Sequence, residues 1–447
     1  MEFFESILTQ ISNLLWGYPL IILLFGTHIY LTIRLRFIQR FIGKAIKISL
    51  GRNKEGSGDI SQFGALTTAL AATIGTGNIV GVSTAVAAGG PGAVLWMWLT
   101  GVFGIATKYS EALLSVKYRV TMKDGSMAGG PMYVLERGLN MKWLAVLFAA
   151  FTSVTAFGIG NMVQANSIST LVNETFQIPT WITGAILTIL TAVVILGGIK
   201  SIANVCERLV PFMAITYFLG CLIILIINYA TVPATFSLIF HSAFSGRAAI
   251  GGFLGAGAKE AIRFGIARGL FSNESGLGSA PIVAAAAQTK NPIRQALVSS
   301  TGTFWDTVVV CAMTGLVVVN SNDWTKGYTG ATLTKNAFSD IHIIGPIILT
   351  LGLLTFVFST ILGWSYYGEK AAEYLFGTKI IKPYRYAWVL FVMIGSMLSL
   401  NMVWTFADIT NALMALPNLV SLLLLSGIIV SETKKYLWDG NLDEFGD

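Results

Sequence analysis

The sequence has very few charged residues for its length. Asp, Glu, Lys and Arg make up 11% of the 447 residues, whereas soluble proteins carry about 25%. With so few charges most helices could not present a wetted face, so a string of soluble domains is excluded. Hydrophobic residues make up 54% and lie in long runs. We therefore predict an all-α polytopic membrane protein, because helices satisfy their own backbone hydrogen bonds in lipid.

Cysteine and histidine are also scarce. Cys206, Cys221 and Cys311 are an odd number of cysteines without zinc or redox spacing, which excludes a disulfide scaffold. Each lies in or beside an apolar run, where a small buried side chain is the ordinary interpretation. The three histidines are too few for a His-based metal site. The sequence also has no Ser/His/Asp constellation and no phosphate-binding loop, so we expect no enzyme activity and no resident cofactor.

Eleven segments are long and apolar enough to cross a membrane as helices, which takes about 20 residues each. They are residues 16–35, 62–87, 92–116, 143–172, 180–198, 207–229, 258–287, 295–319, 343–364, 385–403 and 407–430. No small-residue cleavage site follows the first segment, so it is not a signal peptide. We expect eleven transmembrane helices in the lipid bilayer of the cell membrane.

The basic residues are concentrated in every second loop. Of the 29 Lys and Arg, 22 fall in segments 34–54, 117–142, 200–208, 288–294, 369–386 and 431–447. The alternate segments 88–91, 173–179, 231–251, 320–342 and 404–406 contain only Arg247, Lys326 and Lys335. Because basic loops resist translocation, we predict that the first set is cytoplasmic, with the N-terminus outside and the C-terminus inside. A nucleic-acid-binding patch would not alternate in this way, so no nucleic-acid partner is expected.

A short motif occurs twice in the sequence. The two copies are Gly75-Thr-Gly-Asn78 and Gly276-Leu-Gly-Ser279, which begin 201 residues apart. An alanine-rich stretch and then a proline follow each copy. The same offset carries the five spans of residues 62–229 onto the five spans of residues 263–430. An odd number of helices per repeat places the second repeat in the opposite orientation, as in many secondary transporters. The alternative is chance similarity between two glycine- and alanine-rich segments.

The predicted organisation has five parts. They are an N-terminal helix with a basic loop (1–61), a first repeat (62–229), an extracellular connection (230–257), a second repeat (258–430) and a cytoplasmic tail (431–447).

The spans at 62–87 and 258–287 contain glycines at their centres, and each glycine costs about 1 kcal/mol relative to alanine in a helix. A broken helix in a membrane is tolerated where its freed backbone groups line a cavity or an ion site. The carbonyls that end the first half attract a cation, and the amides that begin the second half attract an anion. Close packing of small residues is the competing interpretation.

Three motifs resemble one family of transporters. The run Ala69-Leu-Ala-Ala-Thr-Ile-Gly-Thr-Gly-Asn78 resembles the first core helix of the leucine-transporter fold. Gly89-Gly-Pro-Gly-Ala-Val-Leu-Trp-Met-Trp-Leu99 and Arg268-Gly-Leu-Phe-Ser-Asn-Glu-Ser-Gly-Leu-Gly-Ser-Ala-Pro281 resemble signatures of the alanine or glycine:cation symporter family. The likeness covers nearly the whole chain. Leu95 stands where that family is expected to have phenylalanine.

The resemblance implies a secondary transporter that moves alanine or glycine together with sodium by alternating access. It implies sodium ligands from the carbonyls of Ala71, Ile74 and Phe356 and the hydroxyls of Ser359 and Thr360. It also implies substrate-binding residues, namely Thr76, Gly77 and Asn78 at the carboxylate, Phe271 covering the substrate, Asn273 and Gly276 in the second break, and Gln164, Thr360 and Trp364 lining the pocket. Oxygen ligands of this kind suit a hard cation.

Several charges lie inside predicted spans, where a charge costs about 2.5–3.5 kcal/mol at the helix centre on insertion scales. Glu274 lies at the second break. Asp306 has two possible roles. It acts in transport, as a cation ligand or a coupling residue, or it is a paired structural carboxylate. Arg268 forms either an outer gate or a static pair with Asp408.

The alternatives to sodium-coupled symport are a proton-coupled or different-substrate transporter of the same fold and, less favoured, an ion channel. A channel needs a continuous polar pore rather than an inverted repeat with two broken helices.

Overall fold

The computed structural model of the chain describes residues 2–51, 56–244, 257–341, 344–398 and 401–445. Their regular structure is helical apart from isolated bridges and one short hairpin, in which β1 (Val120–Thr121) pairs antiparallel with β2 (Met127–Ala128). Val120 lies opposite Ala128. The all-α class predicted from the hydrophobic runs is confirmed for this part of the chain.

The helices follow one another with few long connections. Those of the first half are α1 (Glu2–Leu15), α2 (Tyr18–Arg34), α3 (Ile42–Ser49), α4 (Gln62–Thr73), α5 (Val82–Gly89), α6 (Ala93–Lys117), α7 (Pro131–Tyr133), α8 (Lys142–Thr155), α9 (Val163–Phe176), α10 (Thr180–Ile195), α11 (Gly198–Ile227) and α12 (Val232–Phe244). Those of the second half are α13 (Ala258–Asn273), α14 (Pro281–Ala284), α15 (Pro292–Thr303), α16 (Ala312–Asn320), α17 (Gly330–Phe338), α18 (Ile344–Phe376), α19 (Ile381–Met397), α20 (Asn401–Leu424) and α21 (Ser426–Thr433).

Wider and tighter helical turns join several of these helices. The π-helical turns are Gly77–Gly81, Val134–Gly138, Ala156–Met162, Phe304–Cys311 and Lys434–Trp438, and the 3₁₀ turns are Ile38–Phe41, Asp323–Lys326, Ser339–Ile341 and Thr378–Ile380.

Four continuous helical segments among the described residues are long and apolar enough to cross a membrane. They are Lys142–Phe176, Gly198–Ile227, Pro292–Asn320 and Gly345–Phe376. Three bent pairs pass the same test when each is counted as one span, which gives up to seven: Tyr18–Arg34 with Ile38–Ser49, Gln62–Thr73 with Gly77–Gly89, and Asp408–Leu424 with Ser426–Trp438. By length and composition, the chain is therefore a multi-pass membrane protein.

Helical structure falls on all eleven predicted segments, although the number that cross the membrane stays a prediction. Five helices were not expected: α1 before the first segment, and α3, α7, α12 and α17 inside predicted loops. Helix α1 packs against α20, and it has further apolar residues at a helical spacing, Ile7, Ile11 and Leu14, that are exposed. The search for spans about 20 residues long could not find it because α1 has 14 residues.

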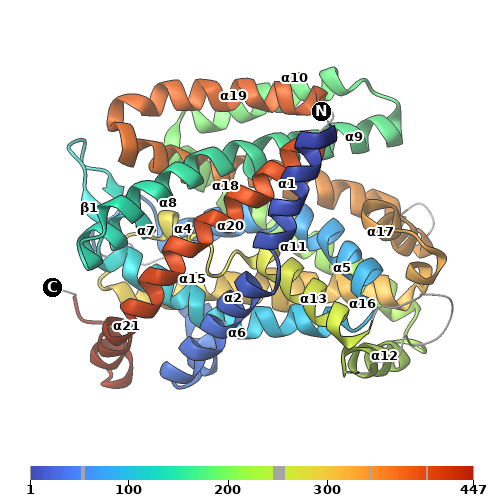
Figure 1. The fold of residues 1–447 in the computed structure, drawn as a ribbon, viewed down its shortest axis with the longest axis horizontal. Helices are drawn as coiled ribbons and strands as arrows, with labels where there is room; N and C mark the ends of the chain where they lie inside the picture. The colour runs from blue at the N-terminus through green and yellow to red at the C-terminus, as the bar shows by residue number, and fades with distance from the viewer. Residues whose placement is uncertain (1, 52–55, 245–256, 342–343, 399–400, 446–447) are drawn as a thin grey trace.

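The packing pairs helices that are distant in sequence. Helix α6 packs against α13 and α15, α8 packs against α18 and α20, and α10 packs against α19. Figure 1 shows α10 and α19 side by side along one edge of the molecule, with α1 crossing the face in front of the bundle. The two broken segments, α4–α5 and α13–α14, contact the helices around them, α4 packing on α11 and α18.

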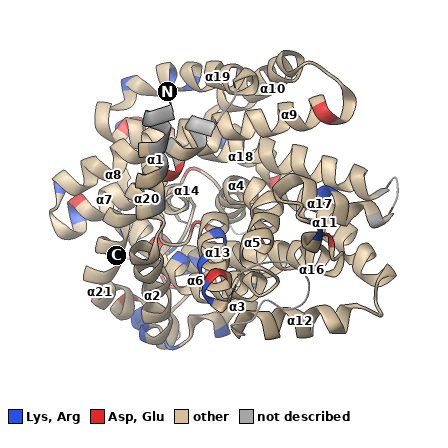
Figure 2. Ribbon diagram, turned by 45° about the vertical axis from the view of Figure 1, so that its right-hand side comes forward, with Lys and Arg blue, Asp and Glu red and all other residues tan. Residues whose placement is uncertain are grey.

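Charged residues are sparse along the helices, as Figure 2 shows. The segments that carry most of the Lys and Arg nevertheless meet at one face. Arg119 donates to the carbonyls of Ala285 and Ala287 at 3.0 and 2.8 Å, and Asn291 Nδ2 donates to the Leu442 carbonyl at 2.9 Å.

Further contacts extend this basic face. Lys117 pairs with Glu432 at 2.7 Å, the Tyr374 hydroxyl donates to Glu136 at 2.6 Å, and Ser61 donates to Glu207 at 2.7 Å. The segments on which the predicted topology depends therefore share one side of the molecule.

Candidate functional site

The first broken segment bends by 54° between Gln62–Thr73 and Gly77–Gly89. Its turn is closed by Asn78, whose Oδ1 accepts from the Gly75 amide at 2.9 Å. A Cβ atom on Gly75 would lie 2.7 Å from Thr360 Oγ1 on α18. Only glycine therefore lets the break approach α18 this closely.

The second break begins where α13 ends at Asn273. Glu274 adopts a left-handed conformation, with φ of 54°. The freed amides of Gly276 and Gly278 both donate to Glu111 Oε1, at 3.0 and 3.1 Å, and Asn418 Nδ2 donates to the Gly276 carbonyl at 2.9 Å. Side chains of α6 and α20 thus satisfy the exposed backbone, as lipid surroundings require.

The five oxygens predicted to bind sodium lie next to one another. Ser359 Oγ lies 3.1 Å from the Ala71 carbonyl oxygen and 2.8 Å from that of Phe356. Thr360 Oγ1 lies 3.4 Å from the Ile74 carbonyl oxygen and 3.0 Å from that of Phe356. All five residues are buried. The hydroxyls therefore bond to their own helix and also reach across to the first break.

A small central cavity adjoins this oxygen cluster. Its volume is about 20 Å³ and its walls come from both breaks, from α9 and the turn before it, and from α18 and α20. It is lined by Ala72, Thr73, Gly75, Thr76, Gly77, Ile159, Gln164, Phe271, Glu274, Thr360, Trp364 and Asn411. A cavity this size has room for about one water molecule, so a substrate must push its walls apart.

The cavity offers hydrogen-bond acceptors that have no donor. Gln164 Oε1 and Asn411 Oδ1 are both buried without a partner in the part of the chain that the structure describes. Glu274 adds a carboxylate, which accepts from Trp364 Nε1 at 3.1 Å and from Ser279 Oγ at 2.5 Å. Buried acceptors without donors are costly, so this arrangement suits a ligand that brings several N–H groups, such as an ammonium.

Six of the predicted substrate residues line the cavity and three do not. Thr76, Gly77, Gln164, Phe271, Thr360 and Trp364 line it.

The other three, Asn78, Asn273 and Gly276, are not part of the cavity lining. Asn273 Nδ2 donates to the Gly269 carbonyl at 2.7 Å, and its Oδ1 accepts from the Ser275 amide at 2.9 Å. The side chains of Asn78 and Asn273 therefore bond to backbone groups at the breaks and stabilise the conformation of the two loops.

Asp306 is surrounded by donors. Asn78 Nδ2 donates to it at 2.7 Å, Ser272 Oγ at 3.0 Å and Thr307 Oγ1 at 2.6 Å. It thereby ties the first break to the end of α13. This geometry favours the structural alternative left open by the sequence.

A second cavity of about 130 Å³ lies on the other side of Phe271. It is lined by Ser12, Trp16, Arg263, Phe264, Ala267, Arg268, Phe271 and Asp408. The Arg268 guanidinium lies 5.9 Å from the centre of the Phe271 ring, and its charge attracts Asp408. Phe271 therefore separates the two cavities, and the predicted gate pair lies together in the second.

Some site residues escaped the sequence analysis. Asn411 was not singled out, and Glu274 was placed at the second break without being assigned to the substrate. Lys108 and Glu111 are buried charges on α6. Their position inside the apolar segment 92–116 was a usable signal, because charges inside spans are rare.

Comparison with known proteins places the chain among membrane transporters. The model of the sodium:alanine symporter family matches residues 1–444. An uncharacterised transporter of Haemophilus influenzae is 54% identical over 97% of this chain and 96% of its own length. The sodium/alanine symporter AgcS of Methanococcus maripaludis is 51% identical over 97% of each chain. The probable sodium/glutamine symporter GlnT of Bacillus subtilis is 34% identical over 97% of this chain and 91% of its own.

The oxygens predicted to bind sodium lie together at a broken helix, beside a cavity with unpaired acceptors, and this arrangement suits the activity for which these relatives are named. By its match over nearly the whole length, the chain belongs to the sodium:alanine symporter family, and it is a sodium-coupled amino-acid symporter rather than an enzyme.

Proposed function

We propose that this protein carries alanine, and also glycine, across the cell membrane together with sodium. A relative named as a sodium/alanine symporter is 51% identical; a relative named for glutamine and another named as an alanine carrier are each 34% identical. The central cavity of about 20 Å³ also favours a small substrate. Opening it for a methyl side chain or a hydrogen requires less displacement of Phe271 and Trp364 than opening it for a long amide side chain.

The observation that carries the proposal is the pairing of the oxygen cluster with the acceptor-rich cavity. Sodium would be held by the carbonyls of Ala71, Ile74 and Phe356 and the hydroxyls of Ser359 and Thr360. The ion would then bridge the first break and α18. Thr360 belongs to both the oxygen cluster and the lining of the cavity. Sodium binding would therefore position a substrate-binding residue, and the coupling would be reciprocal.

The substrate's two charged groups would meet different residues of the cavity lining. Its ammonium would donate to Gln164 Oε1, Asn411 Oδ1 and the Glu274 carboxylate. Its carboxylate would lie at Thr76 and Gly77, where helical structure resumes after the first break and backbone amides favour an anion. In this arrangement Asn78, Asn273 and Gly276 support the site without touching the substrate.

We propose that the architecture is one N-terminal helix followed by a five-plus-five inverted repeat of the leucine-transporter type, with eleven spans. Two observations support it. Adding the repeat offset of 201 to the residue numbers of α10 gives 381–396, which matches α19 at Ile381–Met397. The same shift carries α6 onto α15 and α16, and α6 packs against α15.

The domain organisation follows from this repeat. Residues 1–61 precede it, 62–229 and 258–430 form its halves, 230–257 connect them and 431–447 form the tail. Part of the connection lies outside the described residues. We further propose that the basic face is cytoplasmic and that the N-terminus is outside, because basic segments resist translocation.

Alternating access would use the two sides of the cavity in turn. Phe271, with Arg268 and Asp408 beyond it, would close the outer side. On the basic face, Ser61 at the start of α4 is held to α11 by its hydrogen bond to Glu207. Because α4 and the residue that caps it supply the Ala71 and Ile74 carbonyls, movement at this end would open the cation site inward.

The test is uptake of radiolabelled alanine into proteoliposomes that contain the purified protein. We expect accumulation with an inward sodium gradient and none when potassium replaces sodium. Excess unlabelled glycine should compete, and glutamine should compete far less. Accumulation driven by a proton gradient without sodium would favour the proton-coupled alternative, and glutamine uptake exceeding alanine uptake would contradict the proposed substrate.

A further inference from the structure

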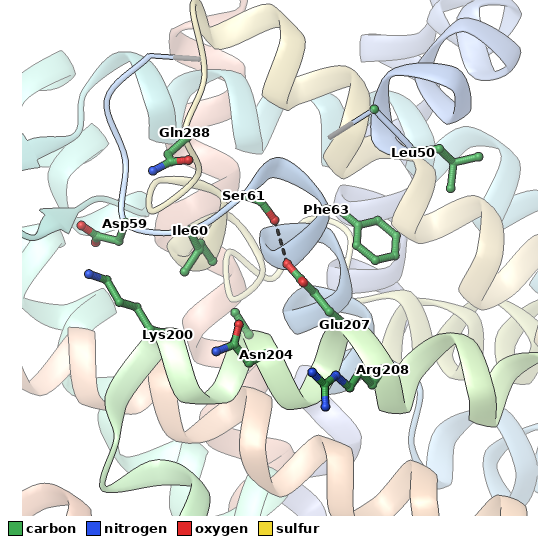
Figure 3. Close-up of a pocket in the computed structure, with 12 residues that line it drawn as sticks. Leu50, Asp59, Ile60, Ser61, Phe63, Lys200, Asn204, Glu207, Arg208 and Gln288 are labelled. Carbon is green, nitrogen blue, oxygen red and sulfur yellow. Dashed lines mark hydrogen bonds between the residues drawn. The ribbon is translucent and has the colours of Figure 1, made fainter. Parts of the chain in front are cut away.

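Two cavities adjoin each other at the basic face, one polar and one apolar. The polar cavity has a volume of about 650 Å³ and lies between the start of α4 and α11. It is lined by Leu50, Gly51, Asp59, Ile60, Ser61, Phe63, Lys200, Ala203, Asn204, Glu207, Arg208 and Gln288. Figure 3 shows Lys200 and Glu207 extending from one helix toward the segment that carries Asp59 to Phe63, with Arg208 lying along the same helix.

The apolar cavity is a groove of about 510 Å³ with almost no polar lining. It is lined by Ile46, Ser49, Leu50, Phe63, Leu66, Thr67, Leu70, Ile74, Val210, Pro211, Ala214, Ile215, Phe218, Leu219, Trp305, Val309 and Val310. Leu50 and Phe63 belong to both cavities, so the groove continues directly from the polar cavity.

The polar cavity has two cations that form no ion pair within the described residues. Glu207 accepts from Ser61, and Asp59 accepts from the Met127 amide at 2.9 Å. Lys200 and Arg208 are exposed and form no ion pair within the described residues. They lie eight residues apart on α11, which places them near the same face of that helix. The lining also holds the carboxylates of Asp59 and Glu207, so its formal charges balance, and Lys200 and Arg208 are the groups that it offers to an anion.

The groove has the length of one leaflet. The wall formed by α4 and its C-cap runs from Phe63 to Ile74, which covers about 16 Å at the rise of an α-helix. Half of the hydrocarbon core of a bilayer is about 15 Å thick. Ile215 and Leu219 on the α11 wall are 58% and 48% exposed, so the groove is open on the side that faces lipid.

We propose that these two cavities form the binding site of one anionic phospholipid. Its phosphate lies at Lys200 and Arg208, and one acyl chain lies in the groove between α4 and α11. An amphiphile fits because the charged part of the site and the apolar part are continuous, and because the charged part lies on the face that carries the basic loops.

The site has a consequence for transport, and this part rests on the proposed function. The groove ends at Ile74, whose carbonyl oxygen is a proposed sodium ligand. An acyl chain packed along α4 holds this residue against α18. Anionic lipid should therefore raise the apparent affinity for sodium.

Lipid retention by the full-length protein tests the binding. Native mass spectrometry would follow the protein after delipidation and incubation with equal amounts of phosphatidylglycerol and phosphatidylcholine. We expect one phosphatidylglycerol to be retained in preference. Lys200→Gln/Arg208→Gln should reduce its retention about thirtyfold, given the usual contribution of each basic residue near anionic lipid. Lys379→Gln/Lys382→Gln, which makes the same charge change on exposed residues of another basic segment, should not reduce it.

A second pair of variants tests the groove. Ala214→Phe fills it and should reduce retention, whereas Val193→Phe adds the same ring on α10 at a side chain that is 73% exposed and should not. Equal retention of the two lipids, retention of detergent alone, or full retention by both the Lys200→Gln/Arg208→Gln and Ala214→Phe variants would overturn the site.

Sodium-dependent alanine uptake in vesicles of either lipid tests the consequence. We expect half-maximal uptake at a several-fold lower sodium concentration with phosphatidylglycerol in the wild type and no such difference in the double variant. An unchanged sodium dependence beside selective retention would overturn the consequence and leave the binding site standing. Absence of sodium-dependent uptake in every lipid would contradict the proposed function, while retention would still decide the lipid site.

Discussion

At the scale of single residues, the polar side chains of the site divide into those that face the cavity and those that hold the backbone. Gln164 and Asn411 present acceptors without donors to the cavity. The side-chain oxygens of Asn78 and Asn273 instead accept hydrogen bonds from backbone amides of the two breaks. The same residue type thus supports different roles, and its partners decide which.

Thr360 should be more important for sodium than for alanine. Thr360→Ala removes one proposed ligand oxygen, and we expect about a tenfold rise in the sodium concentration for half-maximal uptake, since a lost interaction in a buried polar site costs about 1–3 kcal/mol. Alanine affinity at saturating sodium should change less. Thr360→Ser keeps the oxygen and should stay near the wild type. Equal sodium dependence in Thr360→Ala and wild type would contradict the assignment.

Gln164→Met should weaken alanine binding about tenfold, because it removes an acceptor from the cavity at nearly constant shape. Gln295→Met is the matched control. Gln295 is also fully buried with an unpartnered Oε1, but it lies on α15 outside the cavity lining. Isothermal titration with alanine in saturating sodium would measure both. If the two variants lost affinity equally, Gln164 would have no special role at the substrate.

At the scale of elements, the two breaks are stabilised by different means. The first is closed by its own Asn78 and by the close approach of Gly75 to α18. The second depends on Glu111 of α6 and Asn418 of α20, which satisfy its amides and carbonyl. Each break is therefore part of the packing of its neighbours rather than a property of its own segment.

Gly75→Ala should damage the cation site while leaving the helices intact. The added Cβ would lie 2.7 Å from Thr360 Oγ1, so α4 and α18 must separate. We expect at least a tenfold weaker apparent sodium affinity, since overpacking costs about 1–3 kcal/mol. Gly81→Ala is the control, because its Cβ would meet only the Thr76 carbonyl oxygen, at 4.0 Å. Sodium-dependent uptake in both variants would decide, and an unimpaired Gly75→Ala protein would contradict the close approach.

At the scale of the whole molecule, the basic segments share one face although they are scattered along the chain. This agreement between the charge pattern and the packing makes the orientation testable. Leu50 and Phe244 are suitable positions because their side chains are 67% and 65% exposed on opposite sides of the predicted membrane.

Leu50→Cys should be protected and Phe244→Cys should react when intact cells are treated with a membrane-impermeant maleimide. The native cysteines are all buried, so they should contribute little background. Permeabilised cells provide the control, in which both variants should react. Labelling of Leu50→Cys in intact cells would reverse the topology and place the proposed lipid site in the outer leaflet.

Much of the fold could be predicted from the sequence. Low charge and long apolar runs determined the all-α membrane class, because a bilayer admits few other solutions. The central glycines marked both breaks, because glycine is the poorest helix former after proline. The motif resemblance supplied the five oxygens at Ala71, Ile74, Phe356, Ser359 and Thr360, which the structure places together.

Only the tertiary structure decided which way each polar side chain faces. Asn78 and Asn411 look equally suitable in sequence, yet one bonds the backbone of a break and the other faces the cavity. Glu274 likewise accepts hydrogen bonds from Trp364, which lies on a separate helix, and from Ser279, which lies beyond the turn. The physical reason is that local pattern determines where a helix runs and breaks, whereas hydrogen-bond partners come from segments brought together by packing.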